Sequence, residues 1–295
     1  VKGHPEKNDG WFDEYCKREL KQAEEMYQMG FELEAQDWSM ASAEEMRKTF
    51  DEVLEKYQRI ICAWYCQYPL DEYFEETIEN YLAKVVSRDD PDFRKMVLIF
   101  TDPKEMTDVS EERWKLTQLA KEFFAGGEHL KNLSSKARAK IDEHLKKFRY
   151  INRGLATSKP YTYEDIIDRL KEIKHKVNSG TSIDDQIYNA SEKKVEDEYA
   201  WAFEKIKPNA EFKRVIEQAR LHSYVRNRRV EAWFHADYGE SFLYEEIAKR
   251  VNFNPEWIME VSVPEMRAAI DGTPLPSDEE MRKRFENYAM VVQNA

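Results

Sequence analysis

The sequence is poor in the residues that interrupt helices and in those that cross-link chains. Glycine occurs 9 times and proline 10 times among 295 residues, which favours long uninterrupted helices. The three cysteines are an odd number, and no metal-ligating residues accompany Cys62 and Cys66 at a suitable spacing. We therefore interpret the cysteines as buried thiols of a protein in the reducing cytoplasm.

Several motifs of catalysis and membrane insertion are also missing. No apolar run approaches the roughly 20 residues that span a bilayer, and the amino end has no signal-peptide pattern, so we expect no membrane association. The sequence has no Gly-rich phosphate-binding loop, no Gly-x-Ser-x-Gly turn and no His-Glu-x-x-His helix. Because these motifs are missing, we expect this chain to have no catalytic residues of its own.

Positive charge is scarce relative to negative charge. Lys and Arg number 46 against 58 Asp and Glu, which gives a net charge of −12 and an isoelectric point near 5.2. Such a field repels phosphate backbones, so we expect no nucleic-acid partner. The first residue is valine, and we expect the chain to be a segment excised from a longer protein.

What the sequence has in abundance is helical pattern. Capping residues precede many segments, as in Ser42/Glu45, Thr162/Asp165, Ser182/Asp185, Ser262/Glu265 and Ser277/Glu280. Apolar positions recur with a 3.6-residue period. We predict a mostly α, multi-helix bundle with helices at 11–36, 43–67, 70–87, 110–125, 134–149, 163–178, 183–205, 209–236, 240–251, 263–271 and 277–286. We expect loops at 88–109 and 152–162.

The organisation along the chain follows from these segments. We expect an N-terminal helix and lead-in at 1–36 and a helical domain at 37–286. That domain could consist of two sub-bundles that divide near 150–162 or near 180. Met290 to Val292 suggest a short strand, and we interpret 287–295 as the truncated start of a following domain.

The stretch 221–238 carries most of the unusual chemistry. It holds three arginines, two histidines and four aromatic residues. On a helix, His222, Arg226, Arg229 and Trp233 share one face. Two interpretations stay open: a structural network in which the arginines pair with carboxylates of other helices, or a surface that docks a partner domain or an anion.

Glu172 and His175 form the one arrangement with metal-binding spacing. Di-iron helical bundles use a Glu-x-x-His pair, but they need a second such pair and further glutamates from other helices. Glu231 and His235 have the wrong spacing for the second pair, and Glu172 lies in a highly charged stretch. Surface residues are the simpler interpretation, and a helical metalloprotein is the alternative.

Five stretches resemble the helical connecting region of the phosphoenolpyruvate-utilising phosphotransferases, the family of phosphoenolpyruvate synthase and pyruvate phosphate dikinase. Within 219–272, Tyr224, Arg226 and Arg229 are similar to a Tyr-x-Arg-x-x-Arg helix of that region, and Glu-Glu-Ile-Ala-Lys-Arg follows at 245–250. A Thr-Pro-Glu-Glu turn is represented by Val-Pro-Glu-Met at 263–266, with departures at the first and last positions. The other matching stretches are 37–60, 98–120, 144–170 and 281–292.

The resemblance implies a non-catalytic spacer. In this family a helical segment joins an ATP-grasp part to a swivelling domain with a phosphorylated histidine, and both would be partners within the same polypeptide. None of the six histidines has the family's Gly-Gly-x-x-Ser-His context, so no catalytic residue carries over. ATP and Mg²⁺ are expected in the parent enzyme, with no cofactor in this chain. A free-standing helical adaptor that binds a protein partner is the rival hypothesis.

Overall fold

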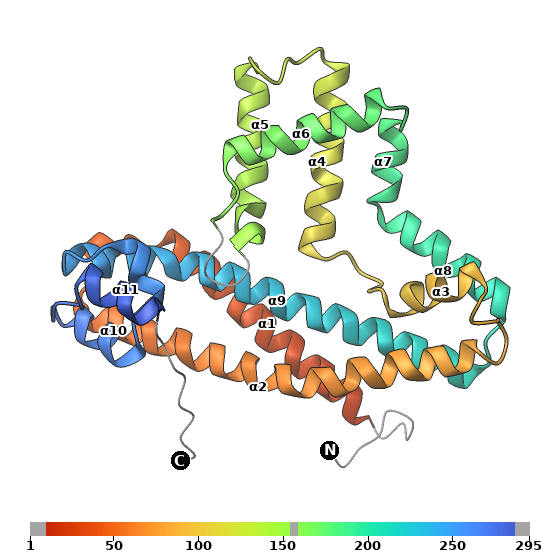
Figure 1. The fold of residues 1–295 in the computed structure, drawn as a ribbon, viewed down its shortest axis with the longest axis horizontal. Helices are drawn as coiled ribbons and strands as arrows, with labels where there is room; N and C mark the ends of the chain where they lie inside the picture. Colours follow the sequence, from red (N-terminus) through yellow and green to blue (C-terminus); the bar gives the residue numbers. More distant parts are fainter. Residues whose placement is uncertain (1–9, 154–158, 287–295) are drawn as a thin grey trace.

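The computed structural model describes residues 10–153 and 159–286, and these residues form an all-α protein without a strand. The predicted fold class is confirmed. The suggested strand at Met290 to Val292 and the segment 287–295 lie outside the described residues. The helices form a long, flat layer and an upright lobe that stands on it (Figure 1).

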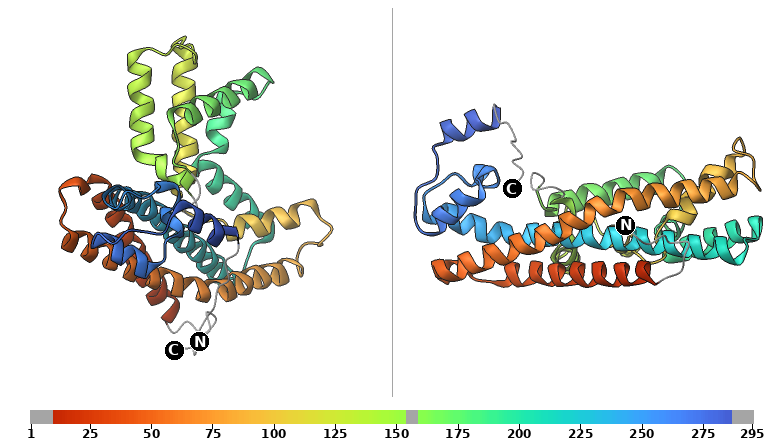
Figure 2. Two further views of the ribbon diagram at one scale, coloured as in Figure 1. Left: turned by 60° about the vertical axis from the view of Figure 1, so that its left-hand side comes forward. Right: turned by 90° about the horizontal axis from the view of Figure 1, so that it is seen from below.

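Three long helices make the layer: α1 (Trp11–Ala35), α2 (Ala43–Leu82) and α9 (Ala210–Arg250). They pack against one another, and in the view from below α2 crosses α9 (Figure 2). We call these three helices the rod. Helix α9 runs parallel to α1, because Arg229 contacts Glu19 and Gly239 contacts Gly30 further along. It runs antiparallel to α2.

Two apolar clusters fill the rod, one at each end. The first gathers around Met26, Phe50 and Leu243, and it is covered by α10 (Val263–Ile270) and the 3₁₀ helix η4 (Pro255–Glu260). A short helix, α11 (Asp278–Glu286), packs on η4. The second gathers around Phe74 and Phe100, where α3 (Pro91–Thr101) and α8 (Glu192–Ile206) close the other end.

The lobe has an apolar core of its own. It consists of α4 (Asp108–Ala125), α5 (Ser135–Phe148), α6 (Tyr163–Asn178) and α7 (Ile183–Asn189). Leu116, Ile141 and Leu170 are buried at its centre. The lobe meets the rod at the start of α4 and at the 3₁₀ helix η3 (Arg149–Arg153), which packs on α9.

Helix starts follow the capping residues of the sequence. Ser42 and Thr162 form full capping boxes with Glu45 and Asp165, and Ser262 forms one with Glu265. Ser182 also caps its helix, by accepting a hydrogen bond from the Asp185 amide. These caps satisfy the amide groups that a helix start leaves unpaired.

Four helix predictions were wrong, each for an identifiable reason. The predicted break between 67 and 70 is absent, because α2 continues through the exposed Pro69, where the missing hydrogen bond faces water. The predicted break between 236 and 240 is absent, because Gly239 lies inside α9. The predicted loop 88–109 contains α3, which begins at Pro91 after an Asp90 cap. The segment 183–205 is two helices, since Ser191 caps α8 separately.

The cysteine interpretation is partly wrong. Cys16 is buried and free, as expected, and burial raises the pKa of its thiol to about 12. Cys62 is exposed on α2, because it faces away from α9. The side chain of Cys66 lies outside the described part of the structure.

Candidate functional site

The predicted arginine face of α9 is directed at α2 and α1. His222, Arg226, Arg229 and Trp233 follow one another along the helix, and each contacts a residue of those two helices. The face therefore lies within the rod, at the seam between α9 and its neighbours.

Arg229 is the most deeply buried member of this face, with 1% of its surface exposed. Its Nη1 donates to Glu19 Oε2 over 3.1 Å, and its Nη2 donates to the side-chain oxygen of Gln67. The Tyr15 hydroxyl lies 3.5 Å from Nη1. A charge this far from water needs such partners, because an unpaired buried guanidinium is costly.

His222 and Arg226 share one carboxylate, that of Asp71 on α2. His222 Nε2 lies 2.9 Å from Asp71 Oδ1, and Arg226 Nη1 lies 3.2 Å from the same oxygen. Desolvation raises the pKa of Asp71, but the contacts with His222 and Arg226 outweigh this effect and lower the pKa below its usual value. Arg226 is only half-buried, so water screens its share of this pairing.

Trp233 completes the face with an aromatic contact. Its ring stacks on Trp64 of α2 at a centroid distance of 4.8 Å, and it meets Tyr57 at 5.4 Å. These rings bury a large apolar area at the middle of the seam.

A second polar cluster, which sequence reasoning missed, lies where the lobe meets the rod. We call it the junction network; its members are Tyr27, Asp108, Tyr150, Arg228 and Glu231. Arg228 Nη1 donates to Asp108 Oδ1 over 3.0 Å and to Glu231 Oε2 over 2.8 Å. The Asp108 amide donates to Glu231, and the Tyr150 hydroxyl donates to Asp108. Tyr27 and Tyr150 join their hydroxyls over 3.0 Å.

The junction network holds two carboxylates close to one arginine, and burial there changes the protonation of Glu231. Desolvation, together with the charge of Asp108, raises the pKa of Glu231 to about 7, although Arg228 opposes the change. Next to the network, desolvation lowers the pKa of His235 to about 4. The Nδ1–H of His235 donates to the Tyr27 carbonyl oxygen over 2.9 Å, and its ring packs against Tyr150.

A third buried ion cluster lies inside the lobe. Arg169 binds both carboxylate oxygens of Glu112, each over 2.6 Å, and His144 Nε2 lies 2.9 Å from Glu112 Oε1. Both partners lower the pKa of Glu112 despite its burial. The cluster links α4, α5 and α6, so it orders the lobe internally.

The residues proposed for a metal site do not come together with further ligands. Glu172 and His175 are exposed on α6. Across residues 10–153 and 159–286, no group of three or more His, Cys, Asp or Glu side chains has a geometry that could hold a metal ion. The same residues contain no helix long and apolar enough to cross a bilayer.

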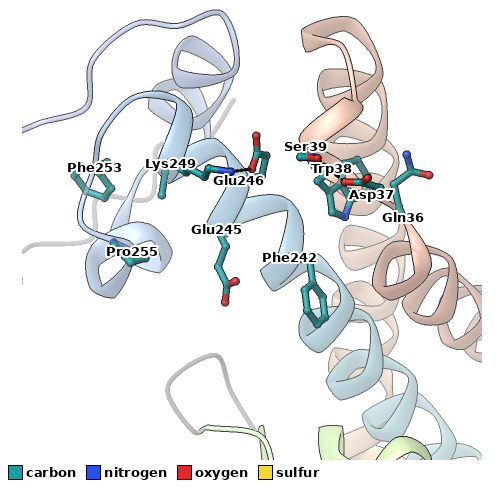
Figure 3. Close-up of a pocket in the computed structure, with 11 residues that line it drawn as sticks. Gln36, Asp37, Trp38, Ser39, Phe242, Glu245, Glu246, Lys249, Phe253 and Pro255 are labelled. Atoms are coloured by element: carbon teal, nitrogen blue, oxygen red, sulfur yellow. Dashed lines mark hydrogen bonds and ion pairs between the residues drawn. The ribbon is translucent and has the colours of Figure 1, made fainter.

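An open cleft of about 520 Å³ lies between the end of α9 and the turn that joins α1 to α2 (Figure 3). Phe242, Trp38 and Phe253 are among its lining residues. Among its polar groups, Glu246 pairs with Lys249 and with the neighbouring Arg250, Asp37 caps the turn, and Gln36 and Glu245 are exposed. The cleft therefore offers no buried polar group to an incoming ligand.

Comparison with protein-family models, with curated proteins and with solved structures found no match.

Sequence spacing could reveal the arginine face but not the junction network. His222, Arg226, Arg229 and Trp233 lie on a single helix, so their shared face follows from the helical period. Asp108 and Glu231 are 123 residues apart in sequence. The one local signal was the additional arginine, Arg228, on a different face of the same helix.

Proposed function

We propose that this chain is a helical spacer and docking domain of a phosphoenolpyruvate synthase-like phosphotransferase. It would separate the ATP-grasp part from the swivelling phosphohistidine domain of the same polypeptide. The observation that carries the proposal is the rod. Helix α2 has 40 residues and α9 has 41, so each is about 60 Å long at about 1.5 Å per residue. A packed layer of such helices can hold two sites at a fixed separation.

The three buried ion clusters support a rigid role. Arg229 joins α9 to both α1 and α2, the junction network joins the lobe to the rod, and Glu112 joins three helices of the lobe. Each cluster loses its hydrogen bonds if its helices slide or tilt. Motion in the parent enzyme would then take place between domains rather than within this one.

The proposal assigns the chemistry to other parts of the polypeptide. ATP and Mg²⁺ would bind in the ATP-grasp part, and the phosphorylated histidine would lie in the swivelling domain. A cytoplasmic location is part of the proposal, and it rests on the acidic composition and the small number of cysteines.

The test uses the natural polypeptide that contains this segment, compared with the segment alone. We expect the natural polypeptide to transfer phosphate from ATP to an acceptor and the segment alone to be inactive. In the natural polypeptide, Arg228→Met should reduce the overall reaction while leaving ATP cleavage in the first half-reaction intact. If both half-reactions proceed at the normal rate in this variant, the spacer role is contradicted.

A free-standing adaptor is the second candidate, and one surface favours it. Ile61, Tyr65 and Tyr68 follow one another on the outer face of α2, and Tyr65 and Tyr68 are 76% and 69% exposed. Exposed rings at helical spacing suit a protein partner. Intact-mass measurement of the native protein separates the two candidates: a species near 35.2 kDa favours the adaptor, and a much heavier one favours the spacer.

A further inference from the structure

A second cleft of about 520 Å³ opens at the other end of the rod, between α8, α9 and the segment that leads into α4. Its apolar walls are Tyr199 and Phe203 from α8, and Leu221 and Tyr224 from α9. The volume is in the range of sites that take small organic molecules. Unlike the cleft in Figure 3, this one is lined by a buried charged group, Arg220.

Arg220 is 7% exposed, yet it forms no ion pair with a carboxylate of the described residues. Its Nε donates to the Asp102 carbonyl oxygen over 2.9 Å, and its Nη2 makes a long contact of 3.5 Å to that of Pro103. The Tyr199 ring lies 4.3 Å from the guanidinium carbon. Desolvation lowers the pKa of Arg220, and the nearby Tyr199 and Asp102 offset this only in part.

Two other arginines of α9 have carboxylates as partners. Arg229 pairs with Glu19, and Arg228 pairs with Asp108 and Glu231. Arg220 instead keeps a positive charge beside a cavity, held in place by two backbone carbonyls and by a hydrogen bond with the Tyr199 side chain. A carboxylate that entered the cavity would complete its coordination with strong, charge-assisted hydrogen bonds.

The remaining lining residues limit the charge and shape of such a ligand. Glu105, Glu196 and Glu217 are exposed at the cleft together with Lys104 and Lys213. With Arg220 included, the lining carries three charges of each sign. A ligand with two or more negative charges would meet the glutamates, so a single carboxylate fits best. The rings of the walls favour a flat, apolar body.

We propose that this cleft binds a small aromatic monocarboxylate, with its carboxylate on Arg220 and its ring against Tyr199, Phe203 and Tyr224. This site is independent of the spacer role, because it needs only α8, α9 and the segment before α4.

Isothermal titration calorimetry with 1-naphthoate tests the proposal, and neutral 1-naphthalenemethanol serves as the matched ligand. The wild-type protein should bind the acid at least about tenfold more tightly than the alcohol, because only the acid can pair with Arg220. Arg220→Met should weaken acid binding by about tenfold or more and leave alcohol binding unchanged. Arg59→Met, on the exposed face of α2, is the control and should bind the acid normally.

A second variant, which changes only an exposed charge at the cleft, tests the proposal if Arg220→Met does not fold. Glu196→Gln removes an exposed negative charge at the cleft and should strengthen 1-naphthoate binding by about twofold. Equal affinity of the wild-type protein for acid and alcohol would overturn the proposal. So would the absence of saturable binding of the acid at millimolar concentration, or unchanged acid binding in a folded Arg220→Met variant.

Discussion

The cost of losing an arginine from α9 depends on what that arginine faces. Arg229 pairs with Glu19 and Gln67 away from water, whereas Arg226 shares Asp71 with His222 near the surface. Arg228 balances two carboxylates at the junction, and Arg220 faces a cavity. Four arginines within ten positions of one helix thus have four different environments.

Arg229→Met should destabilise the protein strongly. Removal of the guanidinium leaves the buried Glu19 carboxylate with only the largely exposed Arg18 as a cationic partner. Loss of one partner of a buried ion pair costs about 3–5 kcal/mol of unfolding free energy in comparable cases. Arg226→Met is the matched control on the same helix and should cost less than about 1 kcal/mol, since Arg226 is half-exposed. Urea unfolding of both variants measures the difference. Equal stability of Arg229→Met and the wild type would contradict the structural role of this residue.

Glu231 should make stability depend on pH near neutrality. Its pKa is about 7 in the folded protein and near 4.5 when unfolded. Between these values the folded protein keeps a proton that the unfolded chain releases, so the free energy of unfolding falls as pH rises from about 4.5 to about 7. Between these two pH values, the free energy of unfolding of the wild type should fall by roughly 1–3 kcal/mol more than that of the Glu231→Gln variant.

His235 acts in the opposite direction, which is why the comparison needs the Glu231→Gln variant. Its folded pKa near 4 lies below the value of 6.5 for the unfolded chain, so its contribution rises with pH between those values. Both proteins contain His235, and its effect therefore cancels in their difference. A difference in unfolding free energy that stays constant between pH 4.5 and 7 would show that Glu231 titrates normally.

The long helices contain residues that often end helices, and packing explains why they continue. Gly239 lies where α9 crosses α1: a Cβ there would stand 2.4 Å from the Gly30 carbonyl oxygen. The glycine that suggested a break is thus the residue that permits close contact. In α2, buried Ile60 and Ala63 precede Pro69, and buried Phe74 and Ile78 follow it. The helix is therefore packed in the core of the rod on both sides of the proline.

Gly239→Ala should therefore destabilise the protein, although alanine has the higher helix propensity. In an open helix this change would stabilise by up to about 1 kcal/mol. Here the methyl group must push α1 and α9 apart, and such overpacking costs about 1–3 kcal/mol. Glu32→Ala, an exposed position on α1, is the control and should change stability by less than about 0.5 kcal/mol. Thermal unfolding that shows a more stable Gly239→Ala variant would contradict the close crossing.

Periodicity and capping residues were sufficient to predict the fold class and several helix ends, such as the start of α6 at Thr162 and Asp165. They could not predict whether helices merge, because that depends on partners distant in sequence. The arginine face was predictable because its residues lie within twelve positions of one helix, so the helical period alone places them on the same side. The junction network and the Arg220 cleft were not, because each combines α9 with residues more than a hundred positions away.

At the scale of the whole molecule, the central claim is that the lobe stands in one fixed position on the rod. Figures 1 and 2 show the lobe upright over the middle of the layer, with α4 and η3 at its base. The junction network is the polar connection at that base. A spacer needs this rigidity, whereas an adaptor whose lobe wraps a partner does not.

A pulsed electron paramagnetic resonance distance measurement tests this claim most directly. One spin label would occupy the exposed native Cys62 on α2, with Cys66→Ser to avoid a second site, and the other would occupy Glu143→Cys, an exposed position on α5. We predict one narrow distance distribution, which Arg228→Met broadens and Arg226→Met leaves unchanged. A broad or multiple distribution in the protein with an intact junction network would contradict the account.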